Sequence, residues 1–252
     1  MSKSFMVAIP ARYGSTRFPG KPLAPIAGRP MILHTCDRAR EAGAARVVVA
    51  TDHEEIAGVC TDAGHEVIMT SADHQSGTDR LAEVVTTLAL ADDEIVINLQ
   101  GDEPLMPPDF IRRLHARLSE ASEARMATLV TPLATAGELH DPNVVKVVIN
   151  RLGEALYFSR APIPWDRQNA GRPASVQCWY RHLGIYAYRV AFLRDYPTMQ
   201  APELERIESL EQLRALWHGE TIVTARVEGD TGPGIDTPEQ LHLAEAALTR
   251  LR

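Results

Sequence analysis

Residues 94–104 read EIVINLQGDEP, an apolar run that passes directly into a charged turn. The run 95–97 shows no polar alternation, which is typical of a strand that is covered on both faces in a parallel sheet. Gly101 and Pro104 break the run, and Asp102 lies between them. The stretch therefore predicts a buried strand with a carboxylate at its carboxyl end.

The same alternation of short apolar runs and amphipathic stretches fills the first half of the chain. The expected strands are Phe5–Pro10, Arg46–Ala50, Glu66–Met69 and Ile95–Leu99, and the expected helices are Met31–Ala42, Glu54–Ala63, Thr78–Leu90 and Asp109–Ser119. This succession predicts an α/β fold with a mainly parallel, Rossmann-like, doubly wound sheet. In such sheets ligands bind beyond the carboxyl ends of the strands, so function is expected in the loops that follow them.

The pattern changes after about Ser122. Strand-like segments then follow one another without a long helix between them, at Met126–Leu133, Val144–Asn150, Ala155–Phe158 and His182–Tyr188. We interpret residues 123–190 as an inserted, more antiparallel section, a candidate for covering the site and for an oligomer contact. A helix at Glu205–Trp217, a strand at Thr221–Val227 and a helix from Pro238 follow. Because no repeat or linker divides the chain, we expect one domain over residues 1–252.

The charge balance argues against one class of partner. The chain has 26 Lys and Arg against 33 Asp and Glu, a net charge of −7. Proteins that grip a nucleic-acid backbone are usually basic, so we expect no nucleic acid as partner. The lysines are Lys3, Lys21 and Lys146, and arginines supply the rest of the positive charge.

Cysteine usage and hydropathy suggest the compartment. Cys36, Cys60 and Cys178 lie far apart and form no CxxC pair, so neither a disulfide framework nor a zinc site is indicated. The apolar stretch at residues 5–11 is too short for a signal sequence, and no run approaches the ~18 apolar residues of a membrane span. We therefore expect a cytoplasmic protein without membrane insertion.

The loop after the first expected strand reads PARYGSTRFPGKPL over residues 10–23. Its small residues would let backbone N–H groups surround phosphate oxygens, while Arg12, Arg17 and Lys21 neutralise their charge. The loop is not a Walker A motif, because its glycines are one residue too far apart and Pro22 follows the lysine. It has no GxGxxG pattern either. The alternative is a solvated basic loop.

Two aspartates far apart in the sequence are candidates for holding a metal ion. Asp102 follows the buried strand, the position at which an α/β nucleotide enzyme would hold Mg2+. Asp236 precedes Thr237 and Pro238, which have the pattern of an N-cap and a first helical residue, so Asp236 is free to point elsewhere. Either aspartate could equally be an ordinary turn or helix-start residue.

A further segment, DHQSGTDR at residues 73–80, combines a helix start with small residues and Arg80. Ser76 and Asp79 have the spacing of a capping box. Backbone N–H groups at such a helix start could recognise a base edge or a sugar. The alternative is a capped helix with a surface pair of Asp79 and Arg80.

Taken together, these segments resemble the 3-deoxy-manno-octulosonate (Kdo) cytidylyltransferases. The resemblance rests on PARYGSTRFPGKPL at 10–23, TDH at 51–53, DHQSGTDR at 73–80, NLQGDEP at 98–104, YFSRAPIPW at 157–165, RHLGIYAY at 181–188, LEQLRALW at 210–217 and GIDTPEQL at 234–241. The motifs occur in order from residue 5 to about residue 245. Asp166–Gln177 and Pro197–Glu203 depart from the family pattern and receive no role.

The resemblance implies a Mg2+-dependent nucleotidyltransferase that converts CTP and Kdo to CMP-Kdo and diphosphate for lipopolysaccharide biosynthesis, as a cytoplasmic homodimer. It also implies roles for individual residues. Phosphate binding falls to Arg12, Arg17 and Lys21, cytidine binding to Ser76, Gly77 and Arg80, Mg2+ binding to Asp102 and Asp236, and Kdo binding to Gln100, Arg160, His182, Glu211 and Gln212. Catalysis would depend mainly on Arg17, Lys21 and Asp102.

These residue types suit the chemistry. In nucleotidyl transfer an oxygen attacks the α-phosphorus and pyrophosphate leaves, so catalysis is mainly positioning and charge neutralisation. Lys21 or Arg17 would stabilise the departing pyrophosphate. Kdo is a carboxylic acid and needs a local positive pocket, for which Arg160 and His182 are the candidates. By themselves, Arg160 could equally be an ion-pair partner and His182 a core histidine.

Some alternatives stay open. Glu211 and Gln212 lie in an expected amphipathic helix, where at least one of them is expected to be an ordinary surface residue, and Met31 and Trp217 are expected in the core. The same chemistry could act on 8-amino-Kdo or another nonulosonate. A non-catalytic nucleotide-sugar binding module is a further alternative, but it has no chemical reason to keep both candidate metal carboxylates and the whole cationic loop.

Overall fold

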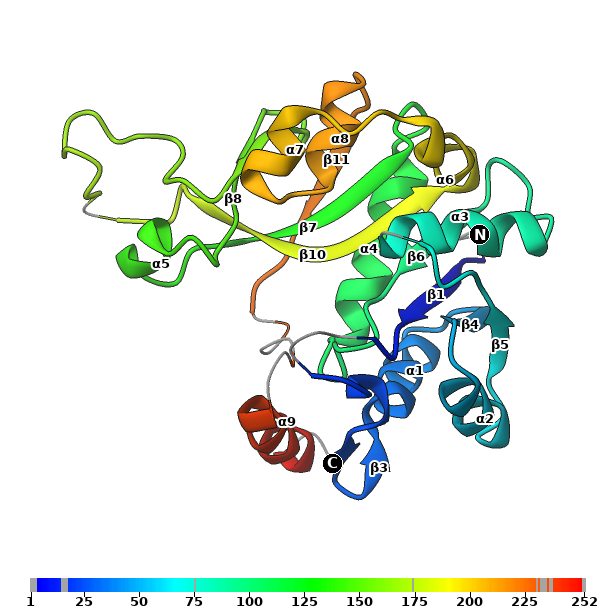
Figure 1. The fold of residues 1–252 in the computed structure, drawn as a ribbon. Coiled ribbons are helices and arrows are strands. Elements are labelled where there is room, and N and C mark those ends of the chain that lie inside the picture. Colours follow the sequence, from blue (N-terminus) through cyan, green and yellow to red (C-terminus); the bar gives the residue numbers. More distant parts are fainter. Residues whose placement is uncertain are drawn as a thin grey trace.

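The structure is a computed structural model that describes residues 4–14, 18–74, 76–173, 175–229, 231, 235 and 238–250. Its parallel half contains the four strands that the apolar runs predict, β1 (Met6–Ala11), β4 (Arg46–Thr51), β5 (Glu66–Met69) and β6 (Ile95–Asn98). They lie in the order β6-β1-β4-β5, and each neighbouring pair is parallel (Figure 1).

Strand β1 shows why these runs lack polar alternation. Every residue of β1 is buried. Val7 and Ile9 pack into one hydrophobic cluster, whereas Met6 and Ala8 pack into another on the opposite face. The first face is covered by α1 (Met31–Glu41), α2 (Glu54–Asp62) and α4 (Pro108–Glu120), and the second by α3 (Gly77–Thr87) and α6 (Val190–Asp195).

The antiparallel part is continuous with the parallel half. Strand β10 (Tyr180–Arg189) pairs antiparallel with β6 on one side and with β7 (Met126–Pro132) on the other, and β11 (Ile222–Arg226) lies parallel to β7. Strands β8 (Lys146–Ile149) and β9 (Ala155–Ser159) branch from the start of β10. The predicted α/β class is confirmed, and the antiparallel section joins the central sheet.

The largest departure from the predicted elements concerns the helix expected at Glu205–Trp217. The segment forms two short helices, α7 (Glu203–Glu208) and α8 (Gln212–Trp217). Ser209 between them has a φ of 51°, in the left-handed region, and this conformation ends α7. Trp217 is 63% exposed, so its predicted place in the core is wrong, whereas Met31 is fully buried as predicted.

Several short elements have no counterpart in the sequence prediction. They are η1 (Lys21–Leu23), β2 (Pro25–Ile26), β3 (Arg29–Pro30), α5 (Ala136–His140), α6 and η2 (Tyr196–Thr198). The predicted final helix is α9 (Pro238–Arg250), and Figure 1 shows it near β3. Its Ala244 and Leu248 pack on Ile26, and the Ala27 N–H donates to Glu245 Oε1 at 3.0 Å. No helix in the described ranges combines the length and apolar character that crossing a bilayer requires.

Candidate functional site

Two adjoining cavities lie at the carboxyl ends of β1 and β6, where the α/β sheet predicts a ligand. The first, of about 330 Å³, is lined by the loop after β1, the start of α3 and the turn after β6, and we name it the loop cavity. The second, of about 310 Å³, lies between β10, α3, α6 and α8, and we name it the aromatic cavity. Gly77, Gln100 and Glu211 line both cavities, so they form one continuous site.

Two predicted cations line the loop cavity. Lys21 Nζ lies 2.6 Å from Asp102 Oδ2, and the two side chains are only 13% and 28% exposed. The Nη2 atom of Arg12 is buried and has no hydrogen-bond acceptor among the residues described. Because a buried cationic N–H group without an acceptor is unfavourable, this position is suited to an anionic ligand.

A left-handed glycine folds the loop back on itself. Gly20 has a φ of 69°, and its N–H donates to the Tyr13 carbonyl at 3.0 Å. A Cβ atom at Gly20 would lie 3.4 Å from the Tyr13 ring, which itself stacks on His53 with ring centroids 3.9 Å apart. This fold of the loop carries Lys21 to Asp102.

The turn after β6 places Gln100 and Asp102 in the loop cavity, as predicted from the strand end. Gly101 separates them and packs closely against β1, because a Cβ atom there would lie 3.1 Å from the Pro10 carbonyl oxygen. A larger residue would push the turn away from the strand, and with it both polar side chains.

The start of α3 forms another wall of the loop cavity. Ser76 Oγ accepts a hydrogen bond from the Asp79 N–H at 3.1 Å and donates to the Asp79 carboxylate at 2.8 Å, which confirms Ser76 as the N-cap. Ser76 and Gly77 both line the cavity. The positive end of the α3 dipole therefore faces the site, an arrangement that favours anions.

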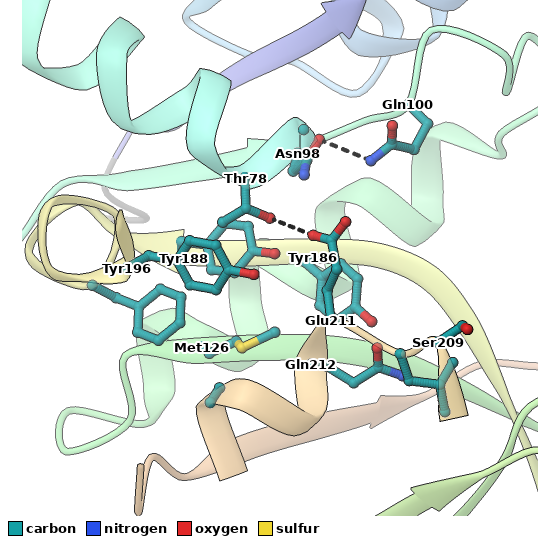
Figure 2. A pocket seen from close by; sticks show the side chains of 14 residues that line it. Thr78, Asn98, Gln100, Met126, Tyr186, Tyr188, Tyr196, Ser209, Glu211 and Gln212 are labelled. Carbon is teal, nitrogen blue, oxygen red and sulfur yellow. Dashed lines mark hydrogen bonds between the residues drawn. The ribbon is translucent and has the colours of Figure 1, made fainter. Parts of the chain in front are cut away.

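Aromatic side chains enclose the second cavity (Figure 2). They come from Tyr186 and Tyr188 of β10, Phe192 of α6 and Tyr196 of η2. Burial raises the pKa of the Tyr188 phenol, so its hydroxyl stays neutral. The Tyr196 hydroxyl and Gln212 Nε2 are buried and have no hydrogen-bond partner within the described part of the chain. Such groups are suited to the hydroxyls of a polar ligand.

Glu211 lies where the two cavities meet. Its Oε2 accepts a hydrogen bond from Thr78 Oγ1 at 3.3 Å (Figure 2). The pKa of Glu211 is raised, chiefly because the surrounding protein desolvates the carboxylate and also because Asp79 repels it. Glu211 and Gln212 both line the aromatic cavity, but only Gln212 is buried; Glu211 is exposed, as expected for at least one of the pair.

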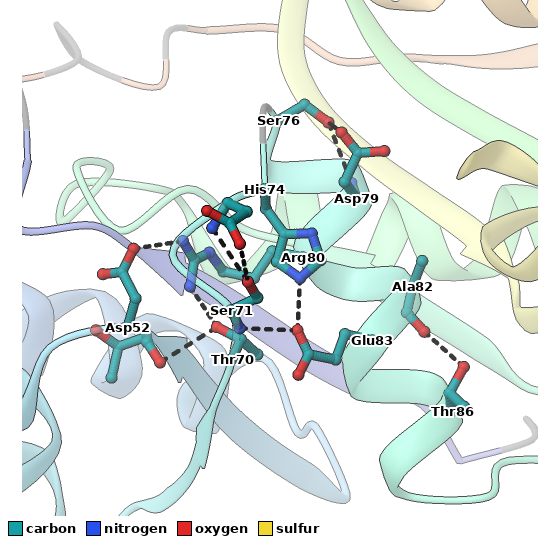
Figure 3. A network of polar contacts seen from close by, with 12 residues as sticks. Asp52, Thr70, Ser71, His74, Ser76, Asp79, Arg80, Ala82, Glu83 and Thr86 are labelled. Carbon is teal, nitrogen blue, oxygen red and sulfur yellow. Dashed lines mark hydrogen bonds and ion pairs between the residues drawn. The ribbon is translucent and has the colours of Figure 1, made fainter. Parts of the chain in front are cut away.

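Arg80 is not brought to either cavity. Its side chain is fully buried, with Nη2 at 2.8 Å from Asp52 Oδ2 and Nη1 donating to Thr70 Oγ1 (Figure 3). The position does not support the predicted contact with cytidine. The alternative surface pair with Asp79 is also wrong, because Arg80 points to the interior.

Arg160 lies outside both cavities, and its guanidinium group donates hydrogen bonds to backbone carbonyls. Its Nε donates to the Glu208 carbonyl at 2.7 Å, Nη1 to the Pro142 carbonyl at 2.8 Å and Nη2 to the Ser209 carbonyl at 3.3 Å. Because all these acceptors belong to the protein, the position does not support the predicted contact with the Kdo carboxylate.

His182 does not supply positive charge either. Its Nε2 lies 3.0 Å from Thr128 Oγ1, and its ring meets Phe158 edge-on at 5.1 Å. Burial lowers the pKa of His182 to about 3, so the imidazole is neutral near pH 7. The positive pocket expected from Arg160 and His182 is therefore not formed by these residues.

The sequence prediction overlooked an acidic residue beside Asp102. The Oε2 atom of Glu103 is buried without a partner among the residues placed in the structure. Burial, followed by repulsion from Asp102, raises the pKa of Glu103 to about 8. The side chain is therefore mostly protonated at neutral pH.

Arg17 and Asp236 lie outside the described residues. Ile235, which precedes Asp236 in the sequence, is fully buried, and its N–H donates to the Asp102 carbonyl at 3.3 Å. Among the residues that the structure covers, no three His, Cys, Asp or Glu side chains gather as a metal site. Of the two aspartates predicted to bind Mg2+, Asp102 is the one that the structure describes.

Most residues of the aromatic cavity were not predicted. Tyr186 and Tyr188 are two residues apart in β10, so their side chains lie on the same face of the sheet. This spacing is visible in the sequence. Tyr196 and Ser209 come from short irregular segments. No local pattern identifies those two as site residues.

Comparison with known proteins adds independent information. A model of the cytidylyltransferase family matches residues 6–222. Curated 3-deoxy-manno-octulosonate cytidylyltransferases are similar over nearly their full length. That of Alkalilimnicola ehrlichii is 56% identical over 252 residues, covering 98% of this chain and 97% of the relative. That of Halorhodospira halophila is 53% identical and covers 99% of this chain and 97% of the relative. That of Yersinia enterocolitica is 51% identical and covers 97% of this chain and 98% of the relative.

Solved structures agree with the curated relatives. A CMP:2-keto-3-deoxy-manno-octonic acid synthetase complexed with CTP is 43% identical, with a TM-score of 0.91, and the match covers 99% of this chain and 100% of that one. A cytidylyltransferase from Leptospira borgpetersenii is 16% identical with a TM-score of 0.64, covering 98% of this chain and 88% of that one. The second similarity concerns the fold alone.

Proposed function

The chain belongs to the family of 3-deoxy-manno-octulosonate cytidylyltransferases, and we propose that it transfers the cytidylyl group of CTP to Kdo, releasing pyrophosphate. The observation that carries this proposal is the junction of the two cavities at Gly77, Gln100 and Glu211. One cavity offers cations to phosphates and the other offers enclosed polar groups to a sugar. The reacting atoms would meet where the cavities join.

The triphosphate occupies the loop cavity in this proposal. Arg12, with a buried Nη2 that lacks an acceptor among the described residues, and Lys21 would bind phosphate oxygens. The positive end of α3 adds its N–H groups at Ser76 and Gly77. As the bond from the α-phosphorus to the pyrophosphate breaks, the leaving group gains negative charge, which the nearby cations stabilise.

Kdo occupies the aromatic cavity. The Tyr196 hydroxyl and Gln212 Nε2 would hydrogen bond its hydroxyls, and the rings of Tyr186 and Tyr188 exclude water from the reacting centre. Held in this way, the 2-hydroxyl of Kdo faces the α-phosphorus across the junction. The gain in rate comes mainly from this positioning.

Mg2+ belongs to the proposal as the cofactor. Asp102 offers the hard carboxylate oxygens that Mg2+ prefers, and it lines the loop cavity beside Lys21. Asp236 is the second proposed ligand, supported by the bond from the preceding Ile235 to the Asp102 carbonyl. When bound, the ion would neutralise charge on the phosphates and increase the acidity of the attacking hydroxyl.

Family membership alone supports three further parts of the proposal: cytoplasmic location, service in lipopolysaccharide biosynthesis, and assembly as a homodimer. The oligomeric state is directly measurable by light scattering after size-exclusion chromatography. A monomer at micromolar concentration would contradict the dimer without affecting the proposed reaction.

The deciding experiment is a pyrophosphate-release assay. CTP, UTP, ATP and GTP are each combined with Kdo, 8-amino-Kdo and N-acetylneuraminate, with and without Mg2+. We expect release from CTP with Kdo in the presence of Mg2+. Release only with another acid would change the acceptor, and no release from CTP with any of them would refute the enzymatic function.

Asp102→Asn tests the proposed metal ligand. Turnover should fall by at least about 100-fold, because a metal ligand contributes several kcal/mol to transition-state stabilisation. Asp109→Asn is the matched control, since Asp109 is exposed on α4 and pairs only with neighbouring arginines in the structure. Near-normal turnover of Asp102→Asn, with an unchanged melting temperature, would remove Asp102 from the metal site.

A further inference from the structure

Tyr13 lies between two residues of the loop cavity but outside it. Arg12 and Gly14 line the cavity, whereas the Tyr13 ring is stacked on His53, with centroids 3.9 Å apart and planes 13° from parallel. The same ring lies against Gly20, the glycine that folds the loop back toward Lys21. The stack therefore contacts the loop at Tyr13, between Arg12 and Gly14, and at Gly20, which precedes Lys21.

His53 is a fixed support for this ring. Its N–H donates to Thr51 Oγ1 at 3.2 Å, and its carbonyl accepts from the Ala57 N–H at 3.0 Å in the first turn of α2. The neighbouring Asp52 forms the ion pair with Arg80, whose side chain is fully buried. Figure 3 shows this pair spanning from the end of β4 to α3.

A physical link therefore runs from α3 to the loop. The start of α3 lines one wall of the loop cavity, and Arg80 lies in the same helix. Arg80 forms an ion pair with Asp52. The next residue, His53, stacks on Tyr13. The two sequence neighbours of Tyr13, Arg12 and Gly14, line the loop cavity. Stacked aromatic pairs favour a defined ring geometry, so this contact restricts the backbone on both sides of Tyr13.

We propose that the Tyr13–His53 stack, anchored by Asp52 and Arg80, positions Arg12 for the phosphates of the nucleotide. This inference rests on the proposed function, in which the loop cavity holds a triphosphate. Tyr13 and His53 are positioning residues in it, because they act through Arg12 and the loop backbone. The stack fixes the distance between the cationic loop and the α3 N-terminus, which must bind the same nucleotide together.

Two pairs of variants separate ring stacking from simple packing. Tyr13→Phe and His53→Phe keep an aromatic ring in place, whereas Tyr13→Ala and His53→Ala remove it. The alanine variants should raise the KM for CTP about tenfold and weaken pyrophosphate binding in calorimetry by a similar factor, which is the scale of one lost aromatic contact. The KM for Kdo should stay within about twofold, and the phenylalanine variants should resemble the wild type.

A double variant tests whether the two rings act together. Tyr13→Ala combined with His53→Ala should raise the KM for CTP no more than either single change, because both remove one contact. The control is His115→Ala, which removes a stacked ring at the far end of β1, where Phe5 and His115 have centroids 4.5 Å apart. We expect that control to lower the melting temperature and to leave the KM for CTP unchanged.

The outcomes distinguish the inference from the proposed function. If the wild type neither binds pyrophosphate nor uses CTP, the proposed function fails. If the wild type does both and the alanine variants keep its KM for CTP and its pyrophosphate affinity, the positioning role of the stack is refuted. Strictly additive effects in the double variant, or a rise in KM for CTP in the phenylalanine variants equal to that in the alanine variants, would also refute it.

Discussion

His182 shows how burial decides the charge of a single residue. The folded protein lowers the pKa of His182 from 6.5 to about 3, because the ring is removed from water. The unfolded chain binds a proton at this histidine below pH 6.5, whereas the folded chain does not until about pH 3. Between these values the unfolded state holds more protons, so His182 makes stability decrease as the pH falls.

A stability measurement at two pH values tests this prediction. From pH 7 to pH 5, His182 alone should cost the wild type on the order of 1–2 kcal/mol of unfolding free energy. His182→Gln removes the titrating ring, so its loss over the same range should be smaller by that amount in urea denaturation. His242→Gln, at an exposed position of α9, should lose as much stability as the wild type. Equal losses in wild type and His182→Gln would show that His182 is not held neutral.

Residue-level prediction from the sequence succeeded where a strand end determines position. Gln100, Asp102 and Arg12 follow β6 and β1 directly, and parallel strands end at the same edge of a sheet, so their convergence could be foreseen. Arg80 and Arg160 are different, because their guanidinium groups bind acceptors that are remote in the sequence. The residue type indicates a charge but not the direction of the side chain.

At the scale of elements, the connection between α7 and α8 determines one wall of the aromatic cavity. The amphipathic pattern predicts a single helix there, but the left-handed Ser209 divides it and places Glu211 and Gln212 at the cavity. Arg160 binds the carbonyls of Glu208 and Ser209, and so satisfies backbone acceptors at the end of α7. These contacts join residues that are far apart in the sequence, so the helical periodicity of residues 205–217 does not predict them.

Replacement of Arg160 tests this account of the wall. Arg160→Ala and Arg160→Lys should both raise the KM for Kdo by about tenfold or more, because neither side chain offers the guanidinium fork that binds several carbonyls. The KM for CTP should change little. Arg113→Ala, in an exposed pair with Asp109, serves as the control. If Arg160→Lys retains normal kinetics while Arg160→Ala does not, charge is what matters, and the role in Kdo binding implied by the family resemblance is restored.

The order of the strands illustrates the same limit of prediction. Strands β1 and β6 follow from their own apolar composition, since both are buried along their whole length. The position of β10 between β6 and β7 cannot be predicted in the same way, because the sequence of a strand does not indicate which strands pair with it. That position brings Tyr186 and Tyr188 to the aromatic cavity beside β6.

At the scale of the whole molecule, α9 connects distant parts of the chain. Ala244 and Leu248 are buried against Ile26 in the third hydrophobic cluster, and Ile235 just before the helix bonds to Asp102. Ile235 thus contacts the turn after β6, and α9, which follows it in the sequence, packs on Ile26. We expect the proposed metal site to depend on this docking.

A charged residue in the docked face should separate α9 from the core. Ala244→Arg places a guanidinium in a buried position, so we expect faster amide exchange in α9 and at least a tenfold loss of turnover. Ala246→Arg introduces the same charge at an exposed position of the same helix and should behave as the wild type. Normal turnover of Ala244→Arg despite rapid exchange would show that the site does not need the docked helix.

The docking of α9 on Ile26 also has a consequence for synthesis on the ribosome. The chain emerges from its N-terminus, so Ile26, Met31 and Leu105 are made long before the Ala244 and Leu248 that cover them. Until then the nascent chain carries an uncovered apolar patch beside an incomplete site. We expect chaperones to bind this patch, and we expect activity to appear only after α9 has left the exit tunnel.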